Sequence, residues 1–413
     1  MLEKAKEKIA VFYFSCIPYD GLYQRPQQLF REWRSHFDDS FDFYYVDFPQ
    51  FTHAVAGVVQ EVLQSIRKKD FNEAGETDSH VIKGCPYPPR GVRGHRLPQW
   101  TFENPFSFEI CNSFILKALD KRCSRSQKRV AIVAAPFWEP FVSKNEFDLV
   151  CYDYLDAIDV SATFYSYSAT KKQHEKLVRR SDVVFVTAEA LKQATLAIAS
   201  DKEVVVVSNG ADSGFFASNR ESHQILDYAK TKRKIVGYIG ALGSWFDLDL
   251  VYAAAEELTE VDFVLVGPFD PKNKKYTKSK PKNVYMLGVK EYAQIPSYVN
   301  IFDVGLIPFQ PGPISDATNP VKLYEYFSLG KPVVATFLRS LEEYDDGRLL
   351  KTAGTAHEFA DAIKFFITQD SQKWQASREQ ISLQNSWLSK ATTIIWTIES
   401  RLRERRTCEH KTL

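Results

Sequence analysis

The chain has 413 residues, 44% hydrophobic and 14% aromatic, which is enough for about two to three globular domains with real cores. Its 53 Lys and Arg against 52 Asp and Glu leave a net charge of +1, which excludes the basic field typical of a nucleic-acid-binding protein. The six cysteines show no Cys-x-x-Cys pair and no His spacing of a zinc site, so they favour a reducing cytoplasm over a disulfide framework.

The N-terminus imitates a signal peptide, because three lysines precede the apolar run 9–17. We reject that interpretation, since Glu3 and Glu7 interrupt the basic region and no small-residue cleavage site follows. The run ends at Pro18 and is typical of a buried first strand. No apolar stretch reaches the roughly 18 to 20 residues that span a bilayer, so we expect a soluble cytoplasmic protein and leave surface attachment to a membrane open.

Short apolar runs alternate with longer helical patterns along the whole chain, which predicts α/β units with parallel sheets. Two series of strands are predicted: 9–14, 41–46, 130–135, 149–152, 183–186 and 204–207, then 234–240, 263–266, 284–287, 304–307 and 332–335. The turn cluster 208–212 separates them, and a polar linker follows to Arg233. Two doubly wound halves imply a cleft, with ligands at the carboxyl ends of the strands.

Several polar side chains follow the first-domain strands. Arg25 lies after Tyr19 in a segment that begins a helix at Pro26, and it has two readings: a clamp for a phosphate or carboxylate, or the partner of a nearby acid. Trp138 could stack on a sugar ring, although such aromatics are more often core. The candidate general bases are the carboxylates placed just past strands, Glu139, Asp153 and Asp156.

Two basic runs, 121–129 and 272–282, admit two readings each. Such runs are usually solvated loops. The alternative is contact with an anionic glycan or lipid surface, at about 1 kcal/mol per basic residue near an anionic leaflet. Neither run settles the question of membrane contact.

The second series opens with a glycine-rich turn after its first strand, 237–247. Such a turn lets backbone amides approach a phosphate. Its spacing, Gly-x-x-Gly-x-x-Gly, is not the dinucleotide fingerprint, and no acid ends the next strand, so a dehydrogenase is disfavoured. Asp247 and Asp249 have the Asp-x-Asp pattern of some metal sites, but we interpret them as a helix cap and expect no metal.

A capped helix then carries a cation and a carboxylate. Asn319 is a favoured N-cap, Pro320 suits the first helical position, and Gly330 suits the left-handed residue after the helix. Lys322 and Glu325 are three residues apart and share a face. A phosphate near Lys322 and a polyol near Glu325 fit this pattern, and a solvated ion pair is the plainer alternative.

The string P-x-K-L-Y-E-Y-x-x-x-G-K-P-V-V at 320–334 resembles the nucleotide-binding signature of group 1, family 4-like glycosyltransferases with the two-domain GT-B fold, particularly bacterial enzymes of surface polysaccharide synthesis. The glycine loop and the Gln24-Arg25-Pro26 element are similar to parts of the same enzymes. Many retaining members carry two glutamates with seven residues between them, of which Glu325 matches the second. The first position holds Ala317, which leaves the stereochemical outcome open.

The resemblance implies two Rossmann-like domains facing a central cleft: an acceptor domain at 1–212, a nucleotide-sugar domain at 213–385, and a C-terminal helix at 386–413 that crosses back to the first domain. It implies a metal-independent hexosyltransferase-like enzyme without cofactors. The donor is a nucleotide diphosphate sugar, with UDP favoured, and the acceptor is a glycan or a lipid-linked saccharide. The residues it assigns to the donor are Gly240, Ala241, Leu242, Gly243, Ser244, Asp316, Thr318, Asn319, Lys322 and Glu325; Arg25, Tyr19 and Trp138 would meet the acceptor or a phosphate.

Two other functions stay open from the sequence: a nucleotide-sugar epimerase of the same fold, and a catalytically silent glycan-binding subunit. An epimerase would convert the donor without an acceptor. A binding subunit would bind glycan and leave the donor unchanged.

Overall fold

The computed structural model describes residues 8–19, 23–47, 78–82, 105–124, 126–158, 167–220, 233–269 and 280–409. Its contacts divide the chain into two compact units. The first comprises the residues up to Thr187, Leu191–Val207 and the chain from Ala391 on; the second comprises Ser208–Lys390 with Ala188–Ala190. The division falls at Val207/Ser208, five residues before the predicted boundary at 212, and most of the predicted C-terminal helix groups with the first unit.

The first unit is built on a parallel seven-stranded sheet of order β3-β2-β1-β4-β5-β6-β7. Its strands are β1 (Ile9–Phe14), β2 (Phe41–Val46), β3 (Val81–Ile82), β4 (Arg129–Val133), β5 (Leu149–Tyr154), β6 (Val183–Val186) and β7 (Glu203–Val206). All the strands except β7 are largely buried, which explains their nearly continuous apolar sequence.

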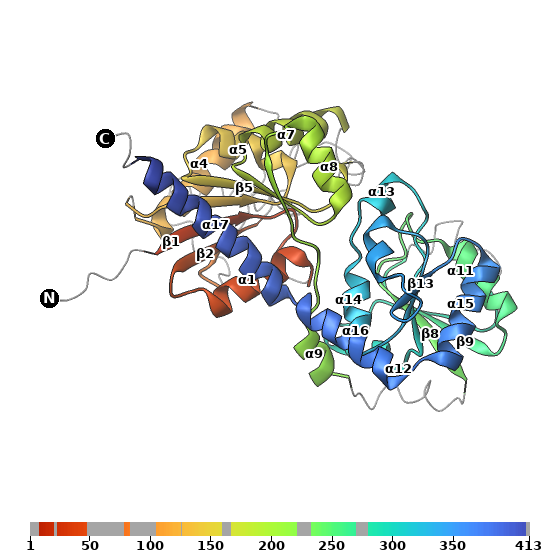
Figure 1. Cartoon of the computed structure of the whole chain (residues 1–413). Helices are drawn as coiled ribbons and strands as arrows, with labels where there is room; N and C mark the ends of the chain where they lie inside the picture. The colour runs from red at the N-terminus through yellow and green to blue at the C-terminus, as the bar shows by residue number, and fades with distance from the viewer. Residues whose placement is uncertain are drawn as a thin grey trace, which may run out of the picture. The chain divides into compact units, whose positions relative to one another are not determined.

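Helices cover both faces of this first sheet. They are α1 (Arg25–His36), α4 (Pro105–Arg122), α5 (Glu139–Lys144), α7 (Tyr167–Arg180), α8 (Glu189–Ile198) and α17 (Trp387–Glu409), with a 3-10 turn at Pro136–Trp138. In Figure 1, α4, α5 and α7 lie on one face, and α1 and α17 lie on the other. The indole N–H of Trp33 in α1 donates to the carbonyl of Ala391 at 3.1 Å, which fixes α17 beside α1.

The second unit repeats the plan with a parallel six-stranded sheet of order β10-β9-β8-β11-β12-β13. The strands are β8 (Lys234–Ile239), β9 (Val261–Val266), β10 (Val284–Gly288), β11 (Val304–Ile307), β12 (Val333–Ala335) and β13 (Leu350–Thr352). In each sheet the first strand lies inside and the order reverses beside it, so the switch points lie between β1 and β4 and between β8 and β11.

The helices of the second unit also form two layers. They are α9 (Ser213–Ser218), α11 (Leu248–Glu257), α12 (Ile295–Ile301), α13 (Pro313–Asp316), α14 (Val321–Phe327), α15 (Ala356–Gln369) and α16 (Gln372–Gln384), with 3-10 turns at Tyr292–Gln294 and Arg339–Tyr344. Figure 1 shows α11 and α15 together on one side of the sheet, with α12, α14 and α16 on the other.

The predicted fold class, α/β with two doubly wound parallel sheets, is confirmed. Every predicted strand exists, with ends that shift by at most two residues. Two strands were missed: β3 has two residues and β13 has three, so neither carries a recognisable pattern. The predicted linker is partly wrong, because Ser213–Ser218 form α9, capped by the Asp212 carboxylate; the rest of it, 221–232, lies outside the described residues.

Asp247 is the N-cap of α11, as predicted, and its carboxylate accepts from the Leu250 N–H at 3.0 Å. The basic run 272–282 lies largely outside the described residues. None of the helices in the described ranges combines the length and the apolar character needed to cross a membrane.

A buried histidine gives the first unit a pH-dependent stability. His174 is 1% exposed, its Nδ1 lies 3.0 Å from the Tyr152 hydroxyl, and burial lowers its pKa to about 4. Between this value and the usual 6.5, the unfolded chain binds a proton that the folded unit refuses, so stability is lost as pH falls through that window.

We therefore expect the free energy of unfolding of the first unit to fall by about 2 kcal/mol between pH 7 and pH 5 on account of His174. Urea unfolding at both pH values measures this loss, and His174→Gln should abolish it. The matched control is His357→Gln, which alters an exposed histidine in the second unit and should leave the loss in place. An equal loss in wild type and His174→Gln would contradict the assignment.

Candidate functional site

The candidate donor site lies at the carboxyl ends of β8 and β11 in the second unit. Gly240 follows β8 with a φ of +145°, a conformation that residues with a Cβ rarely adopt. A Cβ placed on Gly240 would lie 3.3 Å from Cε of Lys322, so the lysine side chain passes directly beside the glycine. The structure thus brings together two predicted residues that are 82 positions apart in the sequence.

The backbone amides of the loop that starts at Gly240 fall into two groups. The N–H groups of Gly240 and Leu242 donate to the carbonyls of Val266 and Pro268, both at 2.9 Å, so these two amides are not available to a ligand. By contrast, the amides of Ala241, Gly243 and Ser244 have no acceptor among the described residues. Backbone N–H groups left free beside a cation form a binding site suited to an anion.

The Lys322–Glu325 pair is preformed on α14. Lys322 Nζ donates to Glu325 Oε2 at 2.8 Å, with the lysine side chain 27% exposed and the glutamate 5% exposed. An ammonium group has three N–H donors, of which Glu325 takes one. Within the described ranges the ammonium has no second acceptor, so two donors remain for a ligand, and the pair is neither a fully exposed surface bridge nor a fully buried one.

The predicted start of this helix is wrong by one residue. Pro320 is the N-cap and α14 begins at Val321. The Asn319 side chain, expected to cap, instead accepts from the Asn209 N–H at 2.9 Å and donates to the Tyr324 hydroxyl at 3.2 Å. Because α14 has only seven residues, the charge of Lys322 carries more weight in the site than the helix dipole.

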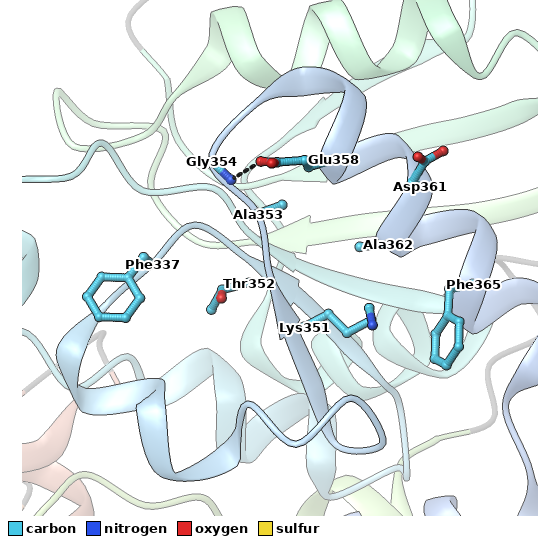
Figure 2. Close-up of a pocket in the computed structure, with 9 residues that line it drawn as sticks. All are labelled: Phe337, Lys351, Thr352, Ala353, Gly354, Glu358, Asp361, Ala362 and Phe365. Atoms are coloured by element: carbon cyan, nitrogen blue, oxygen red, sulfur yellow. Dashed lines mark hydrogen bonds between the residues drawn. The ribbon is translucent and has the colours of Figure 1, made fainter.

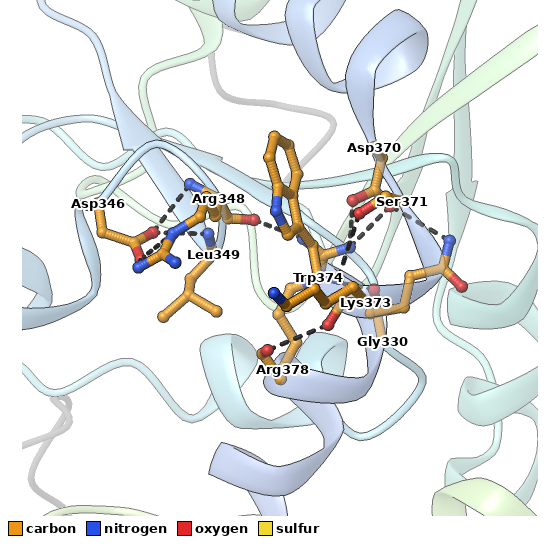
Figure 3. A network of polar contacts seen from close by, with 11 residues as sticks. Gly330, Asp346, Arg348, Leu349, Asp370, Ser371, Lys373, Trp374 and Arg378 are labelled. Atoms are coloured by element: carbon orange, nitrogen blue, oxygen red, sulfur yellow. Dashed lines mark hydrogen bonds and ion pairs between the residues drawn. The ribbon is translucent and has the colours of Figure 1, made fainter.

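The end of α14 is as predicted, with Gly330 at a left-handed φ of +65°. Figure 3 shows what holds this turn: the guanidinium of Arg378, 0% exposed, donates to the carbonyls of Gly330 at 2.7 Å and Arg348 at 2.6 Å, and pairs with both oxygens of Asp370. Sequence reasoning missed Arg378, because nothing local marks a residue whose acceptors are far along the chain.

The loop 308–318 is joined to the glycine loop. Asp247 N–H donates to the Pro308 carbonyl and Gln310 N–H to the Trp245 carbonyl, both at 2.7 Å. The Trp245 side chain is 40% exposed. Asp316 and Thr318 are half-buried in this loop, and Ala317 is buried. The predicted donor residues thus lie on two neighbouring loops and on α14, which follows the second loop.

A separate hollow of about 500 Å³ lies at the carboxyl ends of β12 and β13, and Figure 2 shows its lining. Most of its polar groups are already paired: the Glu358 carboxylate accepts from the N–H groups of Gly354 and Thr355, and the Thr352 hydroxyl donates to Asp345. The Lys351 ammonium lies 4.4 Å from the ring centroid of Phe365. The predicted donor residues all lie in the described ranges, and none of them lines this hollow. We therefore do not place the donor there.

In the first unit, Arg25 and Asp153 form a buried ion pair. Arg25 is 4% and Asp153 0% exposed, and the guanidinium reaches the carboxylate at 2.9 Å while its Nη1 donates to the Val207 carbonyl. The Tyr13 hydroxyl donates to the same carboxylate at 3.0 Å. Of the two readings of Arg25, the structure supports pairing with an acid. The prediction of Asp153 as a general base is wrong, because its carboxylate is fully buried and already bonded to Arg25 and Tyr13.

Trp138 as a sugar-stacking residue is also wrong. It is 0% exposed, packs on Phe14, and donates its indole N–H to the Ser15 carbonyl at 2.8 Å. Glu139 is 5% exposed and accepts from the Ser143 hydroxyl at 2.7 Å. Tyr19 is half-buried against Tyr45. Among the three candidate bases, only Asp156 is exposed.

Residues 233–369 match the family model described as "Glycosyl transferases group 1". Over 225 residues the chain is 24% identical to the "Putative teichuronic acid biosynthesis glycosyltransferase TuaH" of Bacillus subtilis (strain 168), a match that covers 52% of this chain and 56% of that relative.

Solved structures with the same fold cover nearly the whole chain. Alr3699/HepE from Anabaena, in complex with UDP and glucose, is 16% identical with a TM-score of 0.64, over 96% of this chain and 100% of that one. Sucrose-phosphate synthase from Thermosynechococcus elongatus is 13% identical with a TM-score of 0.65, over 97% and 100%. The trehalose 6-phosphate synthase of Burkholderia multivorans is 14% identical with a TM-score of 0.65, over 98% and 100%.

If the Arg25–Asp153 pair supports the fold, Arg25→Met should lower the free energy of unfolding by about 3–5 kcal/mol, because it leaves a buried carboxylate unpaired. Urea unfolding measures this. Arg401→Met is the control, since Arg401 and Glu203 are 37% and 31% exposed and their pair should contribute less than about 1 kcal/mol. Normal stability of Arg25→Met together with lost acceptor binding would restore the reading of Arg25 as a ligand clamp.

The neighbouring structures and the two doubly wound sheets thus give the chain the GT-B fold, and residues 233–369 of the second unit match the model of the group 1 glycosyl transferases.

Proposed function

We propose that this chain is a glycosyltransferase that takes a sugar from a UDP-sugar and transfers it to a glycan or a lipid-linked saccharide in surface polysaccharide synthesis. The observation that carries the proposal is Lys322, which passes beside Gly240 at the switch point, where the loop that follows has three amides with no acceptor in the described part of the chain. The choice of UDP is supported by the UDP and UDP-glucose complexes of Alr3699/HepE, and the acceptor class by the name of the teichuronic acid relative.

In this proposal the diphosphate lies between the glycine loop and α14. The ammonium of Lys322 and the amides of Ala241, Gly243 and Ser244 stabilise the negative charge that develops on the departing nucleoside diphosphate. Glu325, which already accepts from Lys322 through Oε2, accepts a hydrogen bond from the ribose hydroxyls. Because a fixed cation already faces the diphosphate, we propose that transfer of the hexose needs no metal.

The acceptor side of the proposal rests on Asp156. This residue follows β5, at the edge of the first sheet where parallel strands end and ligands collect. Its exposed carboxylate can take the proton of an acceptor hydroxyl, as a general base does. Glu139 has one oxygen engaged by Ser143 and is far less exposed.

Peripheral membrane contact is a further proposal, attached to the lipid-linked acceptor. The basic run 121–129 gives it limited support, because Arg129 pairs with Asp120 at 2.9 Å and Arg122 donates to the carbonyls of Ser79 and Ala118. These contacts engage two of the basic side chains that would otherwise be available to bind an anionic membrane surface.

Donor binding is tested by titrating UDP into wild type, Lys322→Met and Glu325→Gln by calorimetry. We expect each variant to bind about 10- to 100-fold more weakly, since a hydrogen bond to a charged group contributes about 1.5–3 kcal/mol. The control is Lys364→Met, an exposed lysine on α15 that should bind UDP as wild type does. Unchanged affinity in both variants would contradict the assignment of α14.

The same proteins, assayed with UDP-glucose and a saccharide panel in EDTA, separate the possible functions. A metal-independent transferase releases UDP when an acceptor is added. Conversion of the donor without acceptor would indicate an epimerase, and glycan binding without any turnover would indicate a binding subunit.

For the base, we expect Asp156→Asn to lower kcat by about 10²-fold or more while UDP affinity stays unchanged, because general-base catalysis contributes about 10²–10⁴-fold. Steady-state kinetics at saturating donor measures this. Asp201→Asn, which alters another exposed carboxylate of the first unit, is the control and should keep wild-type kcat. Full activity of Asp156→Asn would rule out this base.

A further inference from the structure

The second sheet opens at the place where the candidate donor site lies. Strands β8 and β11 pair at Val236 with Val304 and at Gly237 with Gly305, and their pairing ends there. Yet β8 continues to Ile239 and β11 to Ile307. The carboxyl ends of these two neighbouring strands therefore run on without bonding to each other.

The hydroxyl of Tyr326 fills the opening. It accepts a hydrogen bond from the Ile239 N–H at 3.0 Å and donates to the Leu306 carbonyl at 3.3 Å. One phenol thus satisfies a backbone donor on β8 and a backbone acceptor on β11. Burial raises the pKa of Tyr326 well above its usual range, so the phenol keeps the proton that it donates.

Two glycines make room for this arrangement. A Cβ on Gly305 would lie 2.5 Å from the ring of Tyr326, and a Cβ on Gly237 would lie 2.1 Å from the ring of Phe302. The two rings meet edge to face with centroids 6.4 Å apart. Tyr326 is 0% exposed, so its ring is held by packing and its hydroxyl by two hydrogen bonds.

The same residue connects both halves of the candidate site. Ile239 immediately precedes Gly240, where an added Cβ would lie 3.3 Å from Cε of Lys322, and Tyr326 immediately follows Glu325 on α14. The hydroxyl therefore ties the base of the glycine loop directly to the helix that carries the Lys322–Glu325 pair.

We infer that Tyr326 is a positioning residue that sets the spacing between the loop 240–244 and the Lys322–Glu325 pair, and thereby the affinity for a nucleoside diphosphate. The inference rests on the proposed donor site. Loss of the hydroxyl leaves a buried N–H and a buried carbonyl without partners, so the strands must close or admit water. Either response moves Gly240 relative to Lys322, and small displacements of binding groups have large effects.

The test compares Tyr326→Phe with Tyr344→Phe. Tyr344 is also a buried tyrosine that packs against α14, through the rings of Tyr324 and Phe327, and these two ring contacts lie away from β8 and β11. We expect Tyr326→Phe to bind UDP at least tenfold more weakly and to raise the KM for UDP-sugar equally, with kcat within about threefold of wild type. Amide exchange at Ile239 should accelerate, while Tyr344→Phe retains wild-type affinity.

A second pair of variants tests the same inference if the Tyr326→Phe protein does not fold. Gly305→Ala crowds the Tyr326 ring and should weaken UDP binding in the same direction. Gly354→Ala is its control, because the nearest atom to a Cβ there is 3.6 Å away.

The outcomes are distinct. Wild-type protein that fails to bind UDP overturns the proposed function and this inference with it. If wild type binds UDP, then unchanged affinity of Tyr326→Phe, or an equal loss in Tyr344→Phe, overturns the positioning role alone and leaves the donor site standing.

Discussion

At the carboxyl ends of β8 and β11, the Ile239 N–H and the Leu306 carbonyl are bonded to the Tyr326 hydroxyl and not to each other. A gap between two parallel strands is normally where an α/β sheet binds a ligand, but buried backbone groups at its base need partners. Tyr326 supplies both partners from α14. The glycine loop above the gap and the Lys322–Glu325 pair therefore hold a common position, and the whole candidate donor site depends on that contact.

The two units use buried guanidinium groups for support. In the first unit Arg25 joins α1 to Asp153 on β5 and to the end of β7, and in the second Arg378 joins α16 to the turn at Gly330. Each arginine satisfies several acceptors at once, which offsets the cost of its desolvation. Both therefore strengthen the scaffold close to a candidate site without being exposed to a ligand.

Arg25 and Trp138 show how a residue can fit a functional pattern and still be structural. Arg25 follows β1 and Trp138 follows β4, and functional residues often lie beyond the carboxyl ends of such strands. Both side chains are nevertheless buried. Position along the chain predicts that a side chain lies near an edge of the sheet. It does not predict whether the side chain points into the core, because that depends on which partners reach it from elsewhere, such as Asp153 for Arg25 and the Ser15 carbonyl for Trp138.

The longer strands of both sheets, the glycine turn, the Asp247 cap and the pair on α14 could be predicted from the sequence, because each rests on local periodicity, backbone preference or a spacing of a few residues. The short strands β3 and β13 and the start of α14 could not be predicted, since contacts with distant parts of the chain decide them. Asn319, for example, does not act as the N-cap of α14, because its side-chain oxygen accepts a hydrogen bond from the Asn209 N–H. Only the tertiary structure decided that Lys322 passes beside Gly240, that Asp153 is enclosed, and that Tyr326 bridges two strands. These contacts join residues far apart in the chain, and no local pattern encodes them.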